Sequence, residues 1–198
     1  MTTKIRIWVA GFTLAAVAGL IGMSEASYVE GDKDLKSTVA KIADALKAGD
    51  KDLAKKLAVA AAKNIDEIGD VMHMFRPREK GGMGIGPKTF GTNKAKDGIE
   101  ITLRDLARDV PSNLAKQADA LEATGYYIAA ISELSAAKGW AKDSGKKTKK
   151  AWNEYSEEMT NLGIAFAKAA NGKGAQQLKT AAAKLNENCN RCHSIFKE

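Results

Sequence analysis

Hydrophobic residues recur at steps of three and four along residues 52–75, 111–138, 147–171 and 174–196. This spacing places the apolar side chains of each stretch on one face of an α-helix. Shorter helices are expected at 34–48 and 98–109, and the sequence lacks the alternating pattern of strands. The pattern therefore predicts an all-α protein, in which four long helices pack as a four-helix bundle with short extra helices.

The long connection at residues 76–97 differs from the rest of the chain. It carries four glycines within six residues, Gly81, Gly82, Gly84 and Gly86. It is not a phosphate-binding P-loop, because Pro87 stands where that motif needs lysine and no strand precedes it. Two interpretations remain: a flexible surface loop, or a loop that packs against a cofactor, since glycine allows close backbone approach.

The first 26 residues have the pattern of a secretory signal peptide. Lys4 and Arg6 precede an apolar run from Ile7 to Met23, and small residues follow before Ser27. An uncleaved membrane anchor is the alternative, since the run is close to the shortest length that spans a bilayer. We expect cleavage of residues 1–26, export of a single domain at 27–198, and no later membrane span.

Composition narrows the class of protein. The 198 residues are 44% hydrophobic and 28% charged, with a formal net charge of +7. This is globular composition and excludes a disordered or low-complexity chain. Two cysteines are too few for a disulfide framework, so whatever they do, they do as a pair.

The two cysteines lie in the sequence Cys189-Asn190-Arg191-Cys192-His193. Cys-x-x-Cys-His is the attachment signature of c-type haem. On a helix, residues i and i+3 share a face, at a separation that suits two neighbouring vinyl groups of a porphyrin. The motif predicts one covalent haem c, bound through Cys189 and Cys192, with His193 as the proximal iron ligand.

The side chains of this motif have three alternative uses. A thioredoxin-type redox pair needs a strand-to-helix context. A zinc site would combine these cysteines with His193, with or without His73, the only other histidine, but adjacent Cys192 and His193 do not easily face one tetrahedral metal. A disulfide between the cysteines would distort the helix for little stability. Haem attachment is the prediction, and a haem-free helical interaction protein is the least favoured function.

The motif lies near the end of the last helix and is followed by Phe196 and Lys197. With the bundle pattern, this resembles class II cytochromes c, the cytochrome c′ group. The similarity is strongest over 147–198, weaker over 52–138, and lost over 76–110. The resemblance implies a left-handed four-helix bundle with haem at one end, a periplasmic location, a possible homodimer, and electron transfer or gas binding.

The opposite side of the haem decides between these functions. A methionine or histidine as sixth ligand makes a low-spin electron carrier, whereas an apolar side chain leaves iron open to NO or CO. Met72 is the candidate distal ligand, His73 the alternative and Met74 a third. Equally, Met72 could be core filler and His73 a helix-end residue. In simple up-down order Met72 would lie at the far end from the haem, unless residues 76–110 cross the bundle.

These observations predict an exported electron carrier rather than an enzyme, with a five-coordinate protein that binds or scavenges NO or CO as the alternative. A cluster of lysines precedes Trp152, at Lys146, Lys147, Lys149 and Lys150. It either steers an acidic redox partner to the haem or forms an ordinary solvated turn. Nucleic-acid binding is not expected, because no stacking aromatics accompany the cluster.

Overall fold

The structure is a computed structural model that describes residues 35–87, 97–140, 142–172 and 174–197. Its regular elements are helices: α1 (Leu35–Lys47), α2 (Lys51–Ala62), α3 (Ile68–His73), the 3-10 helix η2 (Arg78–Lys80), α4 (Ile99–Arg108), α5 (Leu114–Lys138), α6 (Lys149–Asn171) and α7 (Ala175–Phe196). No strand forms within these residues, so the all-α prediction is confirmed. None of the helices is both long and apolar enough to cross a membrane. The predicted signal peptide, residues 1–26, lies outside the described residues.

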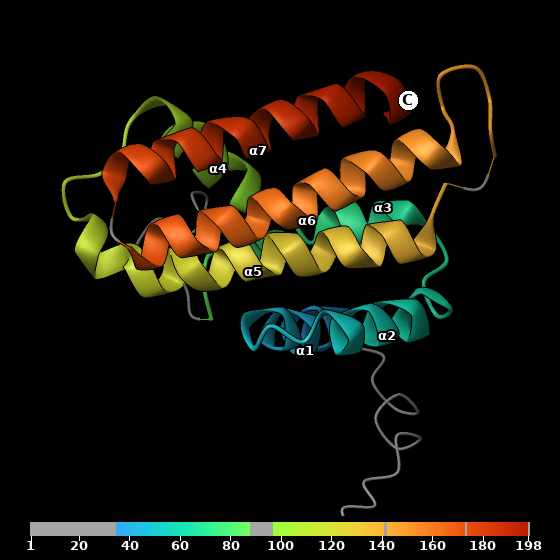
Figure 1. Ribbon diagram of the computed structural model, residues 1–198, viewed down its shortest axis with the longest axis horizontal. Helices are drawn as coiled ribbons and strands as arrows, with labels where there is room; N and C mark the ends of the chain where they lie inside the picture. Colours follow the sequence, from blue (N-terminus) through green and yellow to red (C-terminus); the bar gives the residue numbers. More distant parts are fainter. Residues whose placement is uncertain (1–34, 88–96, 141, 173, 198) are drawn as a thin grey trace, which may run out of the picture.

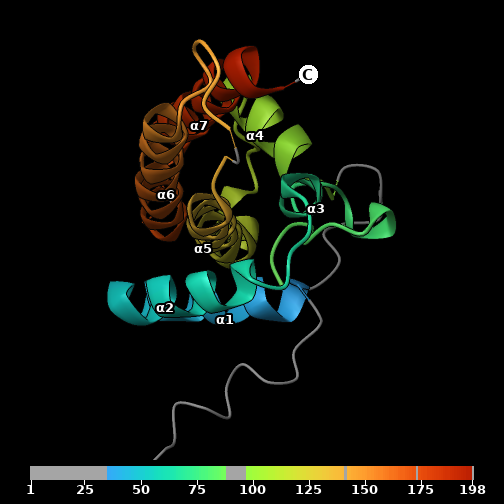
Figure 2. The ribbon, with the colours of Figure 1, turned by 90° about the vertical axis from the view of Figure 1, so that its right-hand side faces the viewer.

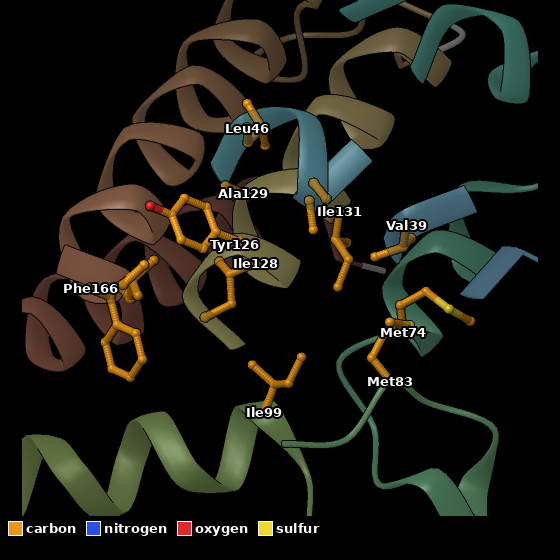
Figure 3. Packing of buried hydrophobic residues seen from close by; sticks show 14 of the residues in the cluster. Val39, Leu46, Met74, Met83, Ile99, Tyr126, Ile128, Ala129, Ile131 and Phe166 are labelled. Carbon is orange, nitrogen blue, oxygen red and sulfur yellow. The ribbon is translucent and has the colours of Figure 1, made fainter. Parts of the chain in front are cut away.

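Helices α5, α6 and α7 lie side by side, with α6 antiparallel to the other two (Figure 1). α4 packs on α7, and α1 and α2 form a hairpin that packs against α5 on the side away from α7 (Figure 2). The core therefore surrounds α5. Figure 3 shows Ile128 and Ile131 of α5 between Leu46 of α1, Phe166 of α6 and Ile99 of α4, all of them buried.

The closest helix contact joins α5 to α6 through small residues. A Cβ atom at Gly125 would lie 2.6 Å from the backbone nitrogen of Ala167, and one at Gly163 would lie 2.8 Å from that of Ala129. Each glycine faces the alanine four residues after the other, so the two small pairs interlock. Only glycine permits this approach, because the obstructing atoms belong to backbone that cannot move aside.

The predicted single helix at 52–75 is wrong: the chain forms α2 and α3 with a break between them. Ile65 is buried in the break, and its carbonyl accepts a hydrogen bond from the ammonium of Lys138 on α5. Asn64 and Asp66 flank it, and such residues favour non-helical backbone because their side chains compete for main-chain hydrogen bonds. The break turns the chain so that α3 also packs on α5.

The surface-loop interpretation of the glycine-rich connection is wrong for residues 82–86, which are all buried. The Arg78 guanidinium donates to both carboxylate oxygens of Asp97 at 2.8 Å, and also to the carbonyls of Ile85 and Gly86. The same carboxylate accepts the Ile85 N–H at 3.0 Å, and the Gly86 N–H donates to Thr124 of α5 at 2.9 Å. This ion pair ties both ends of the connection to the core.

Replacing Gly125 by alanine should destabilise the protein by about 2 kcal/mol, because the added methyl group forces α5 and α6 apart. The matched control is Gly69→Ala in α3, where a Cβ meets nothing within 4 Å. That change should leave stability unchanged or raise it by less than about 1 kcal/mol. Urea unfolding followed by circular dichroism measures both, and equal midpoints would contradict the prediction.

Replacing Asp97 by alanine should cost about 3 kcal/mol, because it leaves the Arg78 charge and the Ile85 N–H without their partner. Asp105→Ala is the control, since Asp105 pairs with Arg104 at 4.0 Å on the surface, with each side chain 52% exposed. Its cost should stay below about 0.5 kcal/mol. The same unfolding measurement decides, and a loss for Asp97→Ala no larger than the control would show that the ion pair is not structural.

Candidate functional site

The Cys-x-x-Cys-His motif lies in the last two turns of α7, which continues unbroken to Phe196. Cys189, Cys192 and Phe196 follow the buried Leu185 at helical steps of three and four, so they share its core-facing side. Both cysteines are free thiols and both are partly buried. The backbone therefore presents two thiols, one turn apart, toward the interior.

The thiols are held in their neutral form. Burial raises the pKa of Cys189 to about 12, with smaller contributions from the neighbouring Cys192 and from Glu100 of α4. Burial also raises the pKa of Cys192 to about 11. Removing water from a thiolate costs free energy, so an uncharged sulfur, whether thiol or thioether, is favoured at this place.

His193 is exposed and lies on the flank of α7 beside α4. Partial loss of water lowers the pKa of its imidazole, the charge of Lys197 lowers it further, and Glu100 acts in the opposite direction. The side chain is therefore neutral at pH 7, which is the form that binds a metal through a ring nitrogen.

A polar clamp joins the motif to α6. The Asn188 amide donates to the Glu158 carboxylate at 2.9 Å and to the Tyr155 carbonyl at 3.4 Å. Arg191 forms an ion pair with the same carboxylate, and its guanidinium lies 5.4 Å from the centre of the Tyr155 ring. Asn188 and Arg191 precede Cys189 and Cys192 respectively, so the clamp sets the rotation of α7 about its axis.

Aromatic rings close this end of the molecule. The Phe196 ring centre lies 5.0 Å from that of Trp152, 5.3 Å from that of Trp140 and 6.5 Å from that of Tyr155. The Trp152 indole N–H donates to the Ser135 carbonyl of α5 at 2.8 Å. The cluster binds the ends of α5 and α7 and the start of α6 together, directly beside Cys192.

The candidate distal residues lie at the same end as the cysteines. The Phe75 carbonyl, which follows them, accepts the N–H groups of Ile99 and Glu100 at the start of α4. Glu100 is in turn close enough to Cys189 and His193 to influence both. The start of α4 therefore lies beside the end of α3, and the up-down order that would separate Met72 from the motif does not apply.

The three candidates differ in their surroundings. Met74 is buried, and its side chain lies beside that of Met83 (Figure 3). Met72 is partly buried at the edge of the core. His73 is exposed. Of the three, Met72 packs against the core while staying partly exposed, whereas Met74 is fully part of the core.

The geometry fits a covalently held porphyrin better than the other uses. Two free thiols on one helical face and a neutral imidazole one residue later form the donor set for thioether links and an axial ligand. A thioredoxin-type site is not formed, because the pair lies inside a long helix. Within the described residues, no three His, Cys, Asp or Glu side chains gather as a metal site.

No protein-family model, curated protein or solved structure matches this chain.

Several residues of the site were missed from the sequence. The motif is surrounded by four residues from different parts of the chain: Glu100 of α4, Trp140 of the α5–α6 connection, Glu158 of α6 and Asn188 of α7. Arg191 lies inside the motif, at a position that the haem signature leaves free. The sequence offers one signal, the i, i+3 spacing of Asn188 and Arg191. This spacing indicates that both lie on one face of the helix, but not that Glu158 of α6 is their partner.

In protein prepared without haem, the cysteines should react slowly with iodoacetamide at pH 8, because only the thiolate attacks. With a pKa of about 11, about one Cys192 in a thousand is ionised at that pH. The rate should still rise at pH 10, with Cys192 reacting before Cys189. Unfolded protein in guanidinium is the control, and its reaction rate should level off near pH 9. A plateau of the rate at that pH for the folded protein would contradict the burial of the thiols.

Proposed function

We propose that this chain is an exported monohaem cytochrome c that carries single electrons between partner proteins. The observation that supports it is the pair of free thiols, Cys189 and Cys192, on the core-facing side of an unbroken helix, followed directly by the neutral imidazole of His193. The predicted signal peptide supports export. Export in turn agrees with the proposal, because c-type haem is attached outside the cytoplasm. The proposed location is the periplasm.

A bound haem would supply an iron centre that accepts and releases one electron. The protein's part would be to hold it in place: Cys189 and Cys192 would form the thioether links, and His193 would offer a ring nitrogen to the iron. The Asn188–Glu158–Arg191 clamp and the packed Phe196 ring fix the rotation and end of α7. A rigid frame of this kind lowers the structural rearrangement that accompanies a change of charge.

We further propose that α4, α5, α6 and α7 form the four-helix bundle that the resemblance implies. The short helix α4, beside the cysteines, then takes the place that the sequence pattern assigned to residues 52–75. Helices α1 and α2 are an addition that covers α5. This assignment also explains why the similarity is lost over 76–110, which contains the buried loop and α4.

Met72 is the proposed sixth ligand of an electron carrier, because it is partly buried and lies at the motif's end of the molecule. The alternative ligand is His73. The second function is a five-coordinate protein that binds NO or CO, and the burial of Met74 beside Met83 favours it by leaving one fewer thioether for iron. An acidic redox protein is the proposed partner, with neither nucleic acid nor membrane as a target.

Expression in a bacterium that exports and matures c-type cytochromes should yield red protein, whose mass exceeds that of the processed chain by one haem. Changing both cysteines to serine should give colourless protein, because the thioether links are lost. Intact mass and absorption spectra measure both. Colourless wild-type protein of unmodified mass would overturn the proposed function.

The Met72→Ala variant distinguishes the carrier from the gas binder. In a carrier ligated by Met72, the low-spin ferrous spectrum becomes high-spin and then shifts on addition of CO. Met159→Ala is the control, since Met159 is also a partly buried methionine but lies on α6. If wild-type protein is already high-spin and binds CO, the gas-binding function replaces the carrier. If only His73→Ala changes the spectrum, His73 is the ligand.

A further inference from the structure

The turn between α5 and α6 is strongly basic and is closed by hydrogen bonds. Residues 142–150, which we name the lysine turn, contain five lysines and one acidic residue, Asp143. Ser144 and Lys147 exchange backbone hydrogen bonds of 2.8 and 2.9 Å, and the Asp143 carboxylate accepts the Lys149 N–H at 2.7 Å. Thr148 caps the start of α6 by accepting the Ala151 N–H at 3.0 Å. The positive charges are thus held on a fixed frame.

The expectation that no aromatic ring accompanies these lysines is wrong, because Trp140 lies against Lys147 and connects this turn to the haem-attachment motif. The Lys147 ammonium lies 5.5 Å from the centre of the Trp140 ring, and that ring lies 5.3 Å from Phe196. Phe196 follows Cys192 by four residues and shares its helical face. Trp140 is partly exposed, so a molecule bound at the lysine turn would touch a ring that is one side chain away from the cysteine-bearing face.

The basic surface is bounded by acidic residues. Lys150, whose side chain is 86% exposed, lies 3.8 Å from Glu154. Glu154, Glu157 and Glu158 then line a shallow hollow on α6. Charge therefore changes sign within about two helical turns. A broad anionic surface such as a membrane or a nucleic acid would meet these carboxylates, whereas a compact acidic patch on a protein would not.

We infer that the lysine turn, together with the adjacent Trp140, is the docking surface for an acidic protein that exchanges one electron with the haem. This inference rests on the proposed function. The step is the transfer of a single electron from ferrous protein to an oxidised acceptor protein, which is reduced by one electron, and no bond forms or breaks. Lysines attract the acidic partner, and Trp140 supplies the flat, partly apolar contact that protein interfaces favour.

The test compares two triple variants of the haem-loaded protein with the same change of net charge. The first replaces Lys146, Lys149 and Lys150 by glutamate. The control replaces three exposed lysines of the α2 region by glutamate, Lys55, Lys56 and Lys63. Stopped-flow oxidation of ferrous protein is followed with ferricyanide, an anion, and with hexaammineruthenium(III), a cation, at low and high salt.

At low salt the lysine-turn variant should react about tenfold more slowly with ferricyanide and faster with the ruthenium complex, and both differences should disappear at high salt. The control should change less than about threefold. Equal changes in the two variants would show that only net charge matters, and unchanged rates would show that electrons leave elsewhere. Either result overturns the docking surface while leaving the cytochrome assignment intact, because the absorption spectrum tests that separately.

Binding gives a readout that does not depend on electron transfer. Calorimetric titration of wild-type protein with poly-L-glutamate should show salt-sensitive binding that the lysine-turn variant loses and the control retains. Sedimentation with phosphatidylserine vesicles tests the membrane alternative. Binding to vesicles that requires the lysine turn, without binding to poly-L-glutamate, would overturn the protein-docking proposal in favour of a lipid surface.

Discussion

The ion pair between Arg78 and Asp97 is the constraint on which the arrangement of the site depends. Its two residues lie at opposite ends of the glycine-rich connection, and the guanidinium also holds two carbonyls of that connection. With the loop closed, the end of α3 lies against the start of α4, where Phe75 accepts two backbone hydrogen bonds. A buried pair of this kind is strongly destabilising when only one partner is removed, so it fixes the position of both helices. Glycine is required at Gly84, where a Cβ atom would lie 2.5 Å from the Asp97 carboxylate and φ is +72°.

A second constraint acts on the other side of the motif. The backbone contact of α5 with α6 at Gly125 and Gly163 leaves no freedom for α6 to slide, since small residues interlock in both directions. α6 then carries Glu158 and Trp152, which hold α7 through a polar clamp and through ring packing respectively. The orientation of Cys189 and Cys192 is thus determined by two sets of contacts, those of α5 with α6 and those of α6 with α7. Neither cysteine takes part in the polar clamp or the ring packing, so their sulfurs stay available for chemistry.

The helices were largely predictable from the sequence, because amphipathic periodicity is a local property. The ranges expected for α1, α4, α5, α6 and α7 agree with the structure to within a few residues. The break at Ile65 was missed: Asn64 and Asp66 are a weak local signal for it, but periodicity continues through it, and the Ile65 carbonyl is satisfied by Lys138, 73 residues away. The burial of residues 82–86 was missed for the same reason: four glycines indicate permissive backbone, and only Arg78, Asp97 and Thr124 together decide that it folds inward. At the site, the cysteine and histidine positions follow from local spacing, whereas Trp140 and Glu158 depend on which helices become neighbours.

The two sides of the proposed haem site therefore have different origins. On the proximal side, only a short connection separates α6 from α7, so the two helices must run antiparallel. This arrangement alone brings the lysine turn and Trp152, at the start of α6, to Phe196 at the end of α7. On the distal side, α3 packs on α5, and the partly buried Arg78–Asp97 ion pair holds the start of α4 beside the end of α3. Changes in the connection can move Met72 without disturbing Cys189, Cys192 or His193. Under the proposed function, such changes would alter the side chain that faces the iron, and with it the choice between electron transfer and gas binding, while the residues proposed to attach the haem stay in place.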